Sequence, residues 1–338
     1  MTVTTPERPR ARYPGISSRA YEHPADRSAL VAMRALSGFD VVLRKLSGLF
    51  RERSVRLLFL STGVRASSGQ FRHLHDTVRD AAYTLDLEDI PELFVVQNAN
   101  PNAMTLGSDR PFIVLSTGLV DLLDTEELRF VIGHEVGHAL SGHAVYRTML
   151  FHLTRLAARA VWVPLGYLGL RAIVAALEEW HRKSELSADR AGLLVGQNPQ
   201  AALRSLMKMA GGAHLQEMNT SAFLEQAEEY DRAADVREGL IKLLNLQGAT
   251  HPFAAPRAAE LESWSRSQSY RRIIDGNYAR REDDRDASLA EEIRNAARSY
   301  QQSMNESNDP FVNLLRDLGG GAANAGEKIF HRFTRRGS

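Results

Sequence analysis

The sequence predicts a mostly helical α+β fold in which a small β-sheet lies beside a helix that carries two histidines. Long stretches of the 338 residues place apolar side chains at helical spacing. Only two short apolar segments, 92–97 and 111–116, are bounded by Asn, Pro and Gly in the manner of strands. A capped helix start follows them at residue 124. A chain of this length can bury one large core with a smaller appendage.

The first part of the chain is expected to be helical after a loose start. Residues 1–26 are rich in Pro, Arg and Ser, which predicts a flexible N-terminal arm. Residues 27–88 look helical, and the apolar spacing is clearest at 70–85. The apolar run 54–60 is interpreted as a strand, because it is short and continuous.

The middle of the chain contains the only long apolar segment, residues 160–177. A membrane-spanning helix needs ~20 mostly apolar residues, and an arginine near its centre, here Arg171, costs ~2.5–3.5 kcal/mol. We therefore interpret the segment as a buried or surface-lying helical pair, with contact to a membrane interface and a true membrane span left open as alternatives. A long helix is expected at 171–195, and three or four more at 199–246, where Pro199 suits a first turn.

The sequence predicts three parts: the arm at 1–26, a main domain at 27–275, and a charged, Gly-rich C-terminal extension at 276–338. Within the extension, the mixed charge run 280–286 is typical of a solvated loop. The basic, aromatic ending 328–336 is typical of a disordered tail, with contact to an anionic membrane surface as the alternative.

Composition excludes several classes of protein. Hydrophobic residues make up 43% and charged residues 25% of the chain, which is ordinary for a globular protein. The net charge of +1 gives no electrostatic reason to expect a nucleic-acid partner. There is no cysteine, so neither a disulfide nor a thiolate metal site can form. Because no apolar run follows the N-terminus, no secretory signal is expected and a cytoplasmic location is the default.

The strongest chemical signal is the motif His134-Glu135-Val136-Gly137-His138. On a helix, positions i and i+4 share one face, so the two imidazoles can chelate one metal ion. Glu135 lies close to that ion without being stacked on it, and its carboxylate can take a proton from activated water. Asp124 and Glu127 have the spacing of a capping box that would start this helix.

The third metal ligand is not on the same helix. The extended motif of metzincins would place a glycine at position 141 and a third histidine at position 144. This chain has Ser141 and Ala144 there, which excludes that class. His143 is one residue short and is predicted to be a surface or packing residue. A carboxylate on a second helix remains, and Glu185 fits. Asp189 follows on the same face, where it could accept a hydrogen bond from a ligand imidazole.

Four features together resemble peptidase family M48, and they cover about half the chain, from roughly residue 90 to 262. They are Asn98–Ala103 with Pro111–Leu119, the motif at 134–138, Glu185 to Asp189, and Thr250-His251-Pro252 with Arg257.

The resemblance implies a zincin-type (gluzincin) peptidase core with one zinc ion per chain. It implies His134, His138 and Glu185 as zinc ligands and Glu135 as general base. It also implies that a substrate strand pairs with the strand edge near Asn102 and Ala103.

The expected activity is that of a zinc-dependent metalloendopeptidase acting on protein or peptide substrates, with broad specificity. His251 is the first candidate for donating a hydrogen bond to the oxyanion, with Arg257 orienting it or binding substrate. In the alternative, His251 instead plugs the open zinc position. Tyr230 is a weaker candidate donor.

Two alternatives to a broad endopeptidase stay open. The first is a zinc-binding chaperone or scaffold with latent peptidase activity. The second is a processing protease that acts at a membrane surface, peripheral to the inner face of the membrane. The well-known relatives have several spanning helices, and this chain lacks clear ones. An aminopeptidase is disfavoured, because its second glutamate would lie closer to the histidines. The sequence does not predict an oligomeric state.

Overall fold

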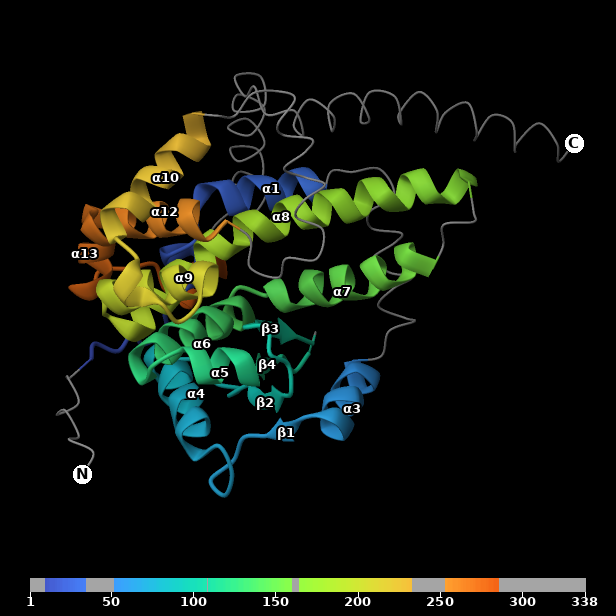
Figure 1. Ribbon diagram of the computed structural model, residues 1–338, viewed down its shortest axis with the longest axis horizontal. Helices are drawn as coiled ribbons and strands as arrows, with labels where there is room; N and C mark the ends of the chain where they lie inside the picture. Colours follow the sequence, from blue (N-terminus) through green and yellow to red (C-terminus); the bar gives the residue numbers. More distant parts are fainter. Residues whose placement is uncertain (1–9, 35–51, 108, 160–163, 233–252, 286–338) are drawn as a thin grey trace, which may run out of the picture.

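The protein is a helical body built around one small mixed sheet (Figure 1). The computed structural model describes residues 10–34, 52–107, 109–159, 164–232 and 253–285. The helices are α1 (Pro24–Arg34), α3 (Glu52–Thr62), α4 (Arg72–Thr84), α5 (Thr117–Leu122), α6 (Thr125–Leu140), α7 (His143–Arg159), α8 (Pro164–Gly196), α9 (Pro199–Gly211), α10 (Thr220–Arg232), α12 (Ala254–Arg266) and α13 (Gln268–Ile274). The strands are β1 (Val64–Arg65), β2 (Glu92–Val96), β3 (Ala103–Leu106) and β4 (Phe112–Ser116), and short 3-10 helices lie at Ser18–Ala20, Leu215–Glu217 and Arg281–Arg285. The mostly helical α+β prediction is confirmed.

The sheet has the strand order β1-β2-β4-β3. The two central strands run parallel, with Glu92 opposite Phe112 and Val96 opposite Ser116. The outer strands β1 and β3 are antiparallel to their neighbours. β4 is buried along its whole length. β3 ends the sheet on the side where it contacts α6 and α7.

The two faces of the sheet pack on different helices, because side chains alternate along each strand. One face joins α4 and α6 in the main core through Leu93, Val95, Ile113 and Leu115. The other face meets Val55 and Phe59 of α3 through Phe94, Phe112 and Val114. Each such side chain contributes ~1.5–3 kcal/mol when fully buried.

Helix α6 begins as the sequence predicts. Asp124 accepts a hydrogen bond from the Glu127 N–H, and the Glu127 carboxylate accepts one from the Asp124 N–H, each at 2.9 Å. The same Glu127 carboxylate is fully buried and meets Arg204 at 3.0 Å and Lys208 at 2.7 Å, both from α9. The capping box therefore also attaches α9 to the start of α6.

Helices α6 and α8 pack unusually closely, because glycines on α6 leave room for side chains of α8. A Cβ atom on Gly133 would lie 2.5 Å from the Cβ of Val195, and one on Gly137 would lie 2.4 Å from the Cβ of Ala191. Real carbon atoms do not approach so closely without repulsion. The two glycines therefore set the distance between the helices that carry the two sequence motifs.

A second hydrophobic cluster joins α1, α7 and α8, which run beside one another in Figure 1. Its buried members are Ala29, Met33, Tyr146, Met149, Leu153, Ile173, Ala176, Leu177 and Trp180. This cluster fixes α1 against the outer side of the two long helices.

The N-terminal segment differs from the flexible arm expected at 1–26. Residues 1–9 lie outside the described residues, but Tyr13, Ile16 and Tyr21 are at most 1% exposed in the main core. Arg281 donates to the Ile16 carbonyl, so residues 276–285 of the predicted extension also pack on this segment. The prediction of a flexible arm is therefore wrong for residues 10–26, because their apolar side chains pack against residues far along the chain. The division into domains stays a prediction.

Two local predictions are also wrong. The run 54–60 lies in helix α3, because a short apolar run alone does not separate a strand from a helix. Residues 164–177 belong to the single helix α8 rather than to a helical pair, and α8 begins at Pro164, earlier than the predicted 171. Residues 160–163 lie outside the described residues.

Candidate metal centre and active site

Helices α6 and α8 bring together five of the side chains predicted from the sequence. His134, Glu135 and His138 come from α6, and Glu185 and Asp189 come from α8. All five are at most 2% exposed. Buried ionisable groups are costly unless they are paired or bind a metal ion. This concentration of ionisable groups therefore marks a functional site rather than a solvated helix face.

Three of these side chains are arranged as metal ligands. His138 Nε2 lies 3.2 Å from His134 Nε2 and 3.2 Å from Glu185 Oε1, and His134 Nε2 lies 3.5 Å from Glu185 Oε2. Tetrahedral zinc with bonds of ~2.0–2.1 Å requires ligand atoms about 3.3 Å apart. One ligand atom from each of the three side chains lies within 4.8 Å of the other two, so the group could hold a zinc ion, and no other such group of three occurs among the described residues.

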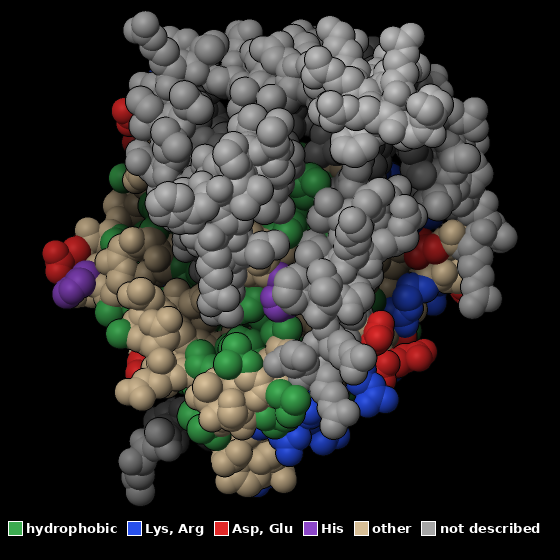
Figure 2. Space-filling view, turned by 90° about the vertical axis from the view of Figure 1, so that its right-hand side faces the viewer, with side chains coloured by type: hydrophobic (Ala, Val, Ile, Leu, Met, Phe, Trp, Pro, Cys, Tyr) green, Lys and Arg blue, Asp and Glu red, His purple; other side chains and the backbone are tan. Residues whose placement is uncertain are grey.

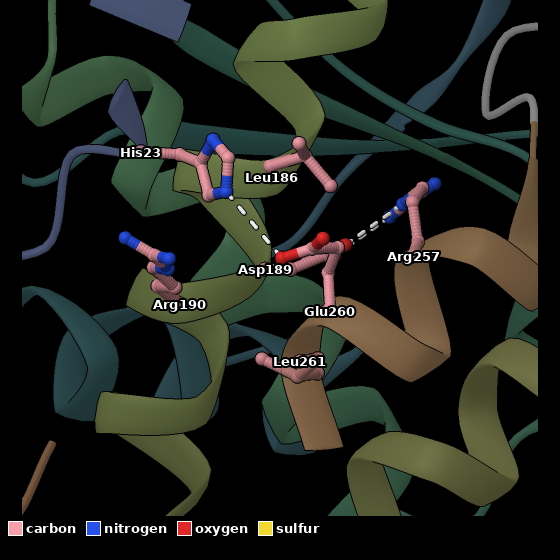
Figure 3. Close-up of a pocket in the computed structure, with 7 residues that line it drawn as sticks. All are labelled: His23, Leu186, Asp189, Arg190, Arg257, Glu260 and Leu261. Carbon is pink, nitrogen blue, oxygen red and sulfur yellow. Dashed lines mark hydrogen bonds and ion pairs between the residues drawn. The ribbon is translucent and has the colours of Figure 1, made fainter. Parts of the chain in front are cut away.

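Asp189 and Arg257 support the candidate ligand His134. Asp189 Oδ1 lies 2.9 Å from His134 Nδ1, and the Asp189 carboxylate accepts two hydrogen bonds from Arg257 at 2.6 and 2.8 Å. Figure 3 shows Asp189 on α8 facing Arg257 on α12. A carboxylate only accepts, so His134 Nδ1 is the donor and its Nε2 lone pair is directed at the metal position. Arg257 also reaches Glu185, with Nη1 3.2 Å from Oε2.

The electrostatics of the site favour positive charge at His134 and oppose it at His138. Burial alone would lower the pKa of His134, but the charge of Glu185 and the hydrogen bond with Asp189 raise it to about 9. Burial, with the charge of Arg147 added, holds the pKa of His138 well below its usual value. Burial would raise the pKa of Asp189, but Arg257 lowers it below the usual range. The His138 imidazole therefore stays neutral, and the His134 imidazole attracts a proton or a metal ion.

The candidate ligand His138 has a support of its own on the opposite side. Its Nδ1 lies 3.0 Å from His143 Nδ1, and His143 Nε2 lies 3.3 Å from Asp26 Oδ2. Asp26 comes from the first turn of α1 and also accepts a hydrogen bond from Ser187 Oγ at 2.6 Å. His143 is 4% exposed, so it is the packing residue rather than the surface residue of the prediction.

Glu135 is held by two groups that sequence analysis did not select. The single hydroxyl hydrogen of Thr105 on β3 is shared between Glu135 Oε2, 2.6 Å from Thr105 Oγ1, and the Glu135 carbonyl oxygen, 2.9 Å away. Arg147 on α7 places Nη1 3.5 Å from Glu135 Oε2 and 3.7 Å from Glu185 Oε1. Arg147 is only 6% exposed. A guanidinium thus lies between the candidate base and the candidate third ligand.

The charges of this cluster balance around a divalent cation. The four carboxylates of the cluster outnumber its two guanidinium groups by two (4 − 2 = 2). The carboxylates are Glu135, Glu185, Asp189 and Asp26, and the guanidinium groups are Arg147 and Arg257. With the histidines neutral, a divalent ion would neutralise the centre.

The remaining predicted residues are placed as follows. Ala103 opens β3 and is fully buried, and Asn102 precedes it, with its N–H donating to Ser116 Oγ at 2.8 Å. Thr105 connects this strand directly to Glu135, so the predicted substrate edge adjoins the catalytic helix. His251 lies outside the described residues, and its role stays a prediction. Tyr230 lies on α10, where its ring packs on Phe253.

The residues that sequence analysis missed left weak signals. Arg147 is the one Lys, Arg, Asp or Glu residue in the mostly apolar stretch 144–153, which is a pattern of buried charge. Thr105 alternates with apolar neighbours in a short strand and gives no such signal. Asp26 lies in a segment that composition alone marks as loose. Its role depends on a tertiary contact.

A buried His-His-Glu set with a second glutamate beside it defines the zincin class of metallopeptidase sites. The model of Peptidase family M48 matches residues 68–265, which is more than half of the chain. The chain belongs to peptidase family M48.

Curated relatives agree with this assignment. The chain is 36% identical over 260 residues to the plastoglobule-localized metallopeptidase 48 of Arabidopsis thaliana chloroplasts, covering 75% of this chain and 74% of the relative. It is 29% identical to a Protease HtpX homolog of Tropheryma whipplei (strain Twist), over 50% of this chain and 67% of the relative. It is 26% identical to Protease HtpX of Legionella pneumophila (strain Corby), over 52% and 70% respectively. No solved structure gives a significant match.

Within the described residues, no helix combines the length and the apolar character needed to cross a membrane. For residues 173–177, the part of the predicted segment whose side chains are described, packing supports this result. Ile173, Ala176 and Leu177 are buried against α1 and α7 rather than presented outward.

Proposed function

We propose that this M48 peptidase is a zinc-dependent metalloendopeptidase with Glu135 as the general base. The observation that carries the proposal is the set of ligand atoms of His134, His138 and Glu185, spaced for one zinc ion, with the Glu135 carboxylate beside them. A bound zinc ion supplies Lewis-acid activation of water and of the scissile carbonyl. The described residues offer no second arrangement of this kind.

Glu135 moves the proton. Its Oε2 accepts the hydrogen bond from Thr105, while its Oε1 lies 3.9 Å from His134 Nε2 and faces the ligand atoms. We assign Oε1 to take a proton from the attacking water and to deliver it to the leaving amine. Thr105 holds the carboxylate in the orientation that this transfer needs.

Two cationic or donor groups are assigned to the developing negative charge. The Arg147 guanidinium is buried within 4 Å of both Glu135 and Glu185, where low solvent exposure strengthens its field. His251 remains the proposed direct donor to the oxyanion. Arg257 is bound to Asp189 and Glu185, which favours a role in orienting the metal ligands over a role in binding substrate.

The proposed substrate is an extended peptide that pairs with the outer edge of β3. Asn102 accepts a hydrogen bond from the Ser116 N–H, so the antiparallel alternation directs the main-chain groups of Thr105 away from β4. Recognition through main-chain groups reads little sequence, which supports a broad endopeptidase.

The test uses the purified full chain and three variants. Glu135→Gln should retain one zinc ion per chain while kcat for a quenched internal peptide falls by about 10²–10⁴-fold. Glu185→Ala should lose most of the zinc. Glu225→Gln, which changes an exposed carboxylate on α10, is the matched control and should behave like the wild type. Full zinc retention in Glu185→Ala, or activity of Glu135→Gln within about tenfold of wild type, would refute these roles.

One observation favours the alternative of a zinc-binding scaffold with latent activity. His138, Glu135 and Glu185 are fully buried, so a substrate carbonyl can reach them only after the surrounding residues move. Zinc-loaded wild-type protein that leaves both casein and the quenched peptide intact would support this alternative. Hydrolysis that depends on Glu135 would exclude it.

Location and membrane contact are further parts of the proposal. We propose that the enzyme is cytoplasmic and that it contacts a membrane peripherally. The membrane contact is supported by one relative, which is named for plastoglobules. Figure 2 shows hydrophobic side chains gathered on the described surface of the side that carries α3. There α3 exposes Leu57, Leu58 and Leu60. Co-sedimentation with anionic vesicles would support a membrane-surface protease, and its absence would oppose it.

A further inference from the structure

His143 on α7 and Asp26 on α1 form a chain of contacts that starts at the candidate zinc ligand His138. His138 Nδ1 lies 3.0 Å from His143 Nδ1 at the start of α7, and His143 Nε2 lies 3.3 Å from Asp26 Oδ2 on α1. His138 and Asp26 are fully buried, and His143 is 4% exposed. The line is thus shielded from solvent along its length.

With His143 neutral and Asp26 ionised, the donors and acceptors of this line allow one arrangement. A carboxylate only accepts, so the His143 proton is on Nε2, the atom that lies 3.3 Å from Asp26 Oδ2. His143 Nδ1 then has no proton and accepts one from His138 Nδ1–H. A neutral His138 with its proton on Nδ1 has an unprotonated Nε2. That is the atom that faces His134 and Glu185 at 3.2 Å.

We propose that Asp26 and His143 are positioning residues for zinc: they fix the His138 tautomer that leaves Nε2 free to bind the metal ion. The proposal rests on the zinc site of the proposed function and deepens it. It assigns to His138 a support equivalent to the one that Asp189 gives His134, but built from two residues in series. Partners of this kind typically change metal affinity by 10–100-fold.

The contacts around Asp26 show why its carboxylate stays in place. Ser187 on α8 donates to Asp26 Oδ2 at 2.6 Å, and its Oγ accepts the His23 N–H at 2.9 Å. His23 in turn pairs with Glu260 on α12, with Nε2 3.5 Å from Oε2, as Figure 3 shows. Ser187 lies two residues after Glu185 on α8. The contacts from Ser187 through Asp26, His143 and His138 therefore lead back to Glu185 on the same helix. Helix α8 holds the zinc ligand Glu185 and also anchors the residue that orients His138.

The N-terminal helix therefore belongs to the metal centre. Tyr21 strengthens this link, since its hydroxyl lies 3.1 Å from Ser141 Oγ at the end of α6. A purely structural role for His143 is the competing explanation, because its ring also packs edge-on against Trp180 at 5.3 Å between centroids. The two explanations differ in what they require of residue 143: packing needs only its volume, whereas orientation needs its donor and its acceptor.

The experiment compares His143→Leu with His143→Gln in the full-length protein. Leucine keeps an apolar side chain of similar size, whereas the glutamine amide can accept from His138 and donate to Asp26. Zinc dissociation constants come from competition with a chromophoric chelator, and the visible spectrum of the Co²⁺-loaded protein reports ligand geometry. We expect His143→Leu to weaken zinc binding by about 10–100-fold with an altered Co²⁺ spectrum, and His143→Gln to remain near wild type.

Two further variants separate orientation from anchoring. Asp26→Ala should weaken zinc binding like His143→Leu, and combining the two should add little, because both break one chain of hydrogen bonds. Ser187→Ala removes one anchor of Asp26 but leaves the Asp26 carboxylate and His143 present, so it should weaken zinc binding less than Asp26→Ala does. Glu225→Gln, an exposed change on α10, is the control, and its zinc affinity should stay within about twofold of wild type.

Wild-type zinc affinity in His143→Leu, or equal losses in the leucine and glutamine variants, would overturn the proposal while leaving the zinc peptidase assignment in place. Wild-type protein that binds no zinc would overturn both. Circular dichroism melts of each variant establish that the comparison is made between folded proteins.

Discussion

Gly137 is the residue whose substitution tests most directly how the site is assembled. It lies between the two candidate histidine ligands and faces Ala191 on α8. A Cβ atom at Gly137 would lie 2.4 Å from the Cβ of Ala191. Apolar carbon atoms pack at ~3.5–4.0 Å. In Gly137→Ala, α6 and α8 must therefore separate by about 1–1.5 Å, or rotate by an equivalent amount.

The same displacement opens the metal centre, since its ligands come from these two helices. His138 Nε2 and Glu185 Oε1 are 3.2 Å apart, close to the ~3.3 Å edge of a tetrahedral zinc site. A misplacement of about 1 Å can cost ~10²-fold in rate. Overpacking also costs ~1–3 kcal/mol of stability, of which the better helix propensity of alanine recovers up to ~1 kcal/mol. We therefore expect activity to fall much more than stability.

The assay measures the zinc dissociation constant, peptide hydrolysis and urea unfolding for Gly137→Ala. The matched control is the double variant Gly137→Ala/Ala191→Gly, which moves the methyl group from α8 to α6 and removes the clash. It should recover most of the zinc affinity and the activity. The reasoning would be refuted by a Gly137→Ala protein with wild-type zinc affinity and activity, or by a double variant no better than the single one.

Three further predictions concern charge and hydrogen bonding. Arg147→Gln should lower kcat by about 10²-fold with zinc content unchanged, as steady-state kinetics and metal analysis can establish. Thr105→Val should lower kcat by about tenfold, because it frees the Glu135 carboxylate without removing a ligand; unchanged kcat would contradict the orienting role. Asp86→Asn should cost about 1 kcal/mol in urea unfolding at pH 7. The hydrogen bond from the Gly15 N–H, together with nearby arginines, lowers the pKa of Asp86. A lowered pKa stabilises the folded state above the unfolded value of about 4, and this stabilisation is lost as pH falls through the lower folded value. The difference between wild type and Asp86→Asn should therefore shrink below about pH 4, and a difference independent of pH would contradict it.

Local patterns predicted the elements that depend on local physics. The capping box of Asp124 and Glu127 has the predicted bonds, and the strands at 92–97 and 111–116 formed near the expected bounds. The run 54–60 was predicted wrongly, because a short apolar run suits a strand and a buried helix face equally well. Composition likewise marked 10–26 as loose, although burial against distant residues holds that segment in the core.

The sequence by itself determined the metal-binding chemistry. His134, Glu135 and His138 share a helix face through 3.6-residue periodicity, which needs no tertiary information. Only the tertiary structure decided how α6 meets α8, α7 and α1. That packing brings Glu185 to the histidines, Arg147 to Glu135, and Asp26 through His143 to His138. Such contacts depend on where whole helices come to rest, which close packing of many side chains sets and no local spacing encodes.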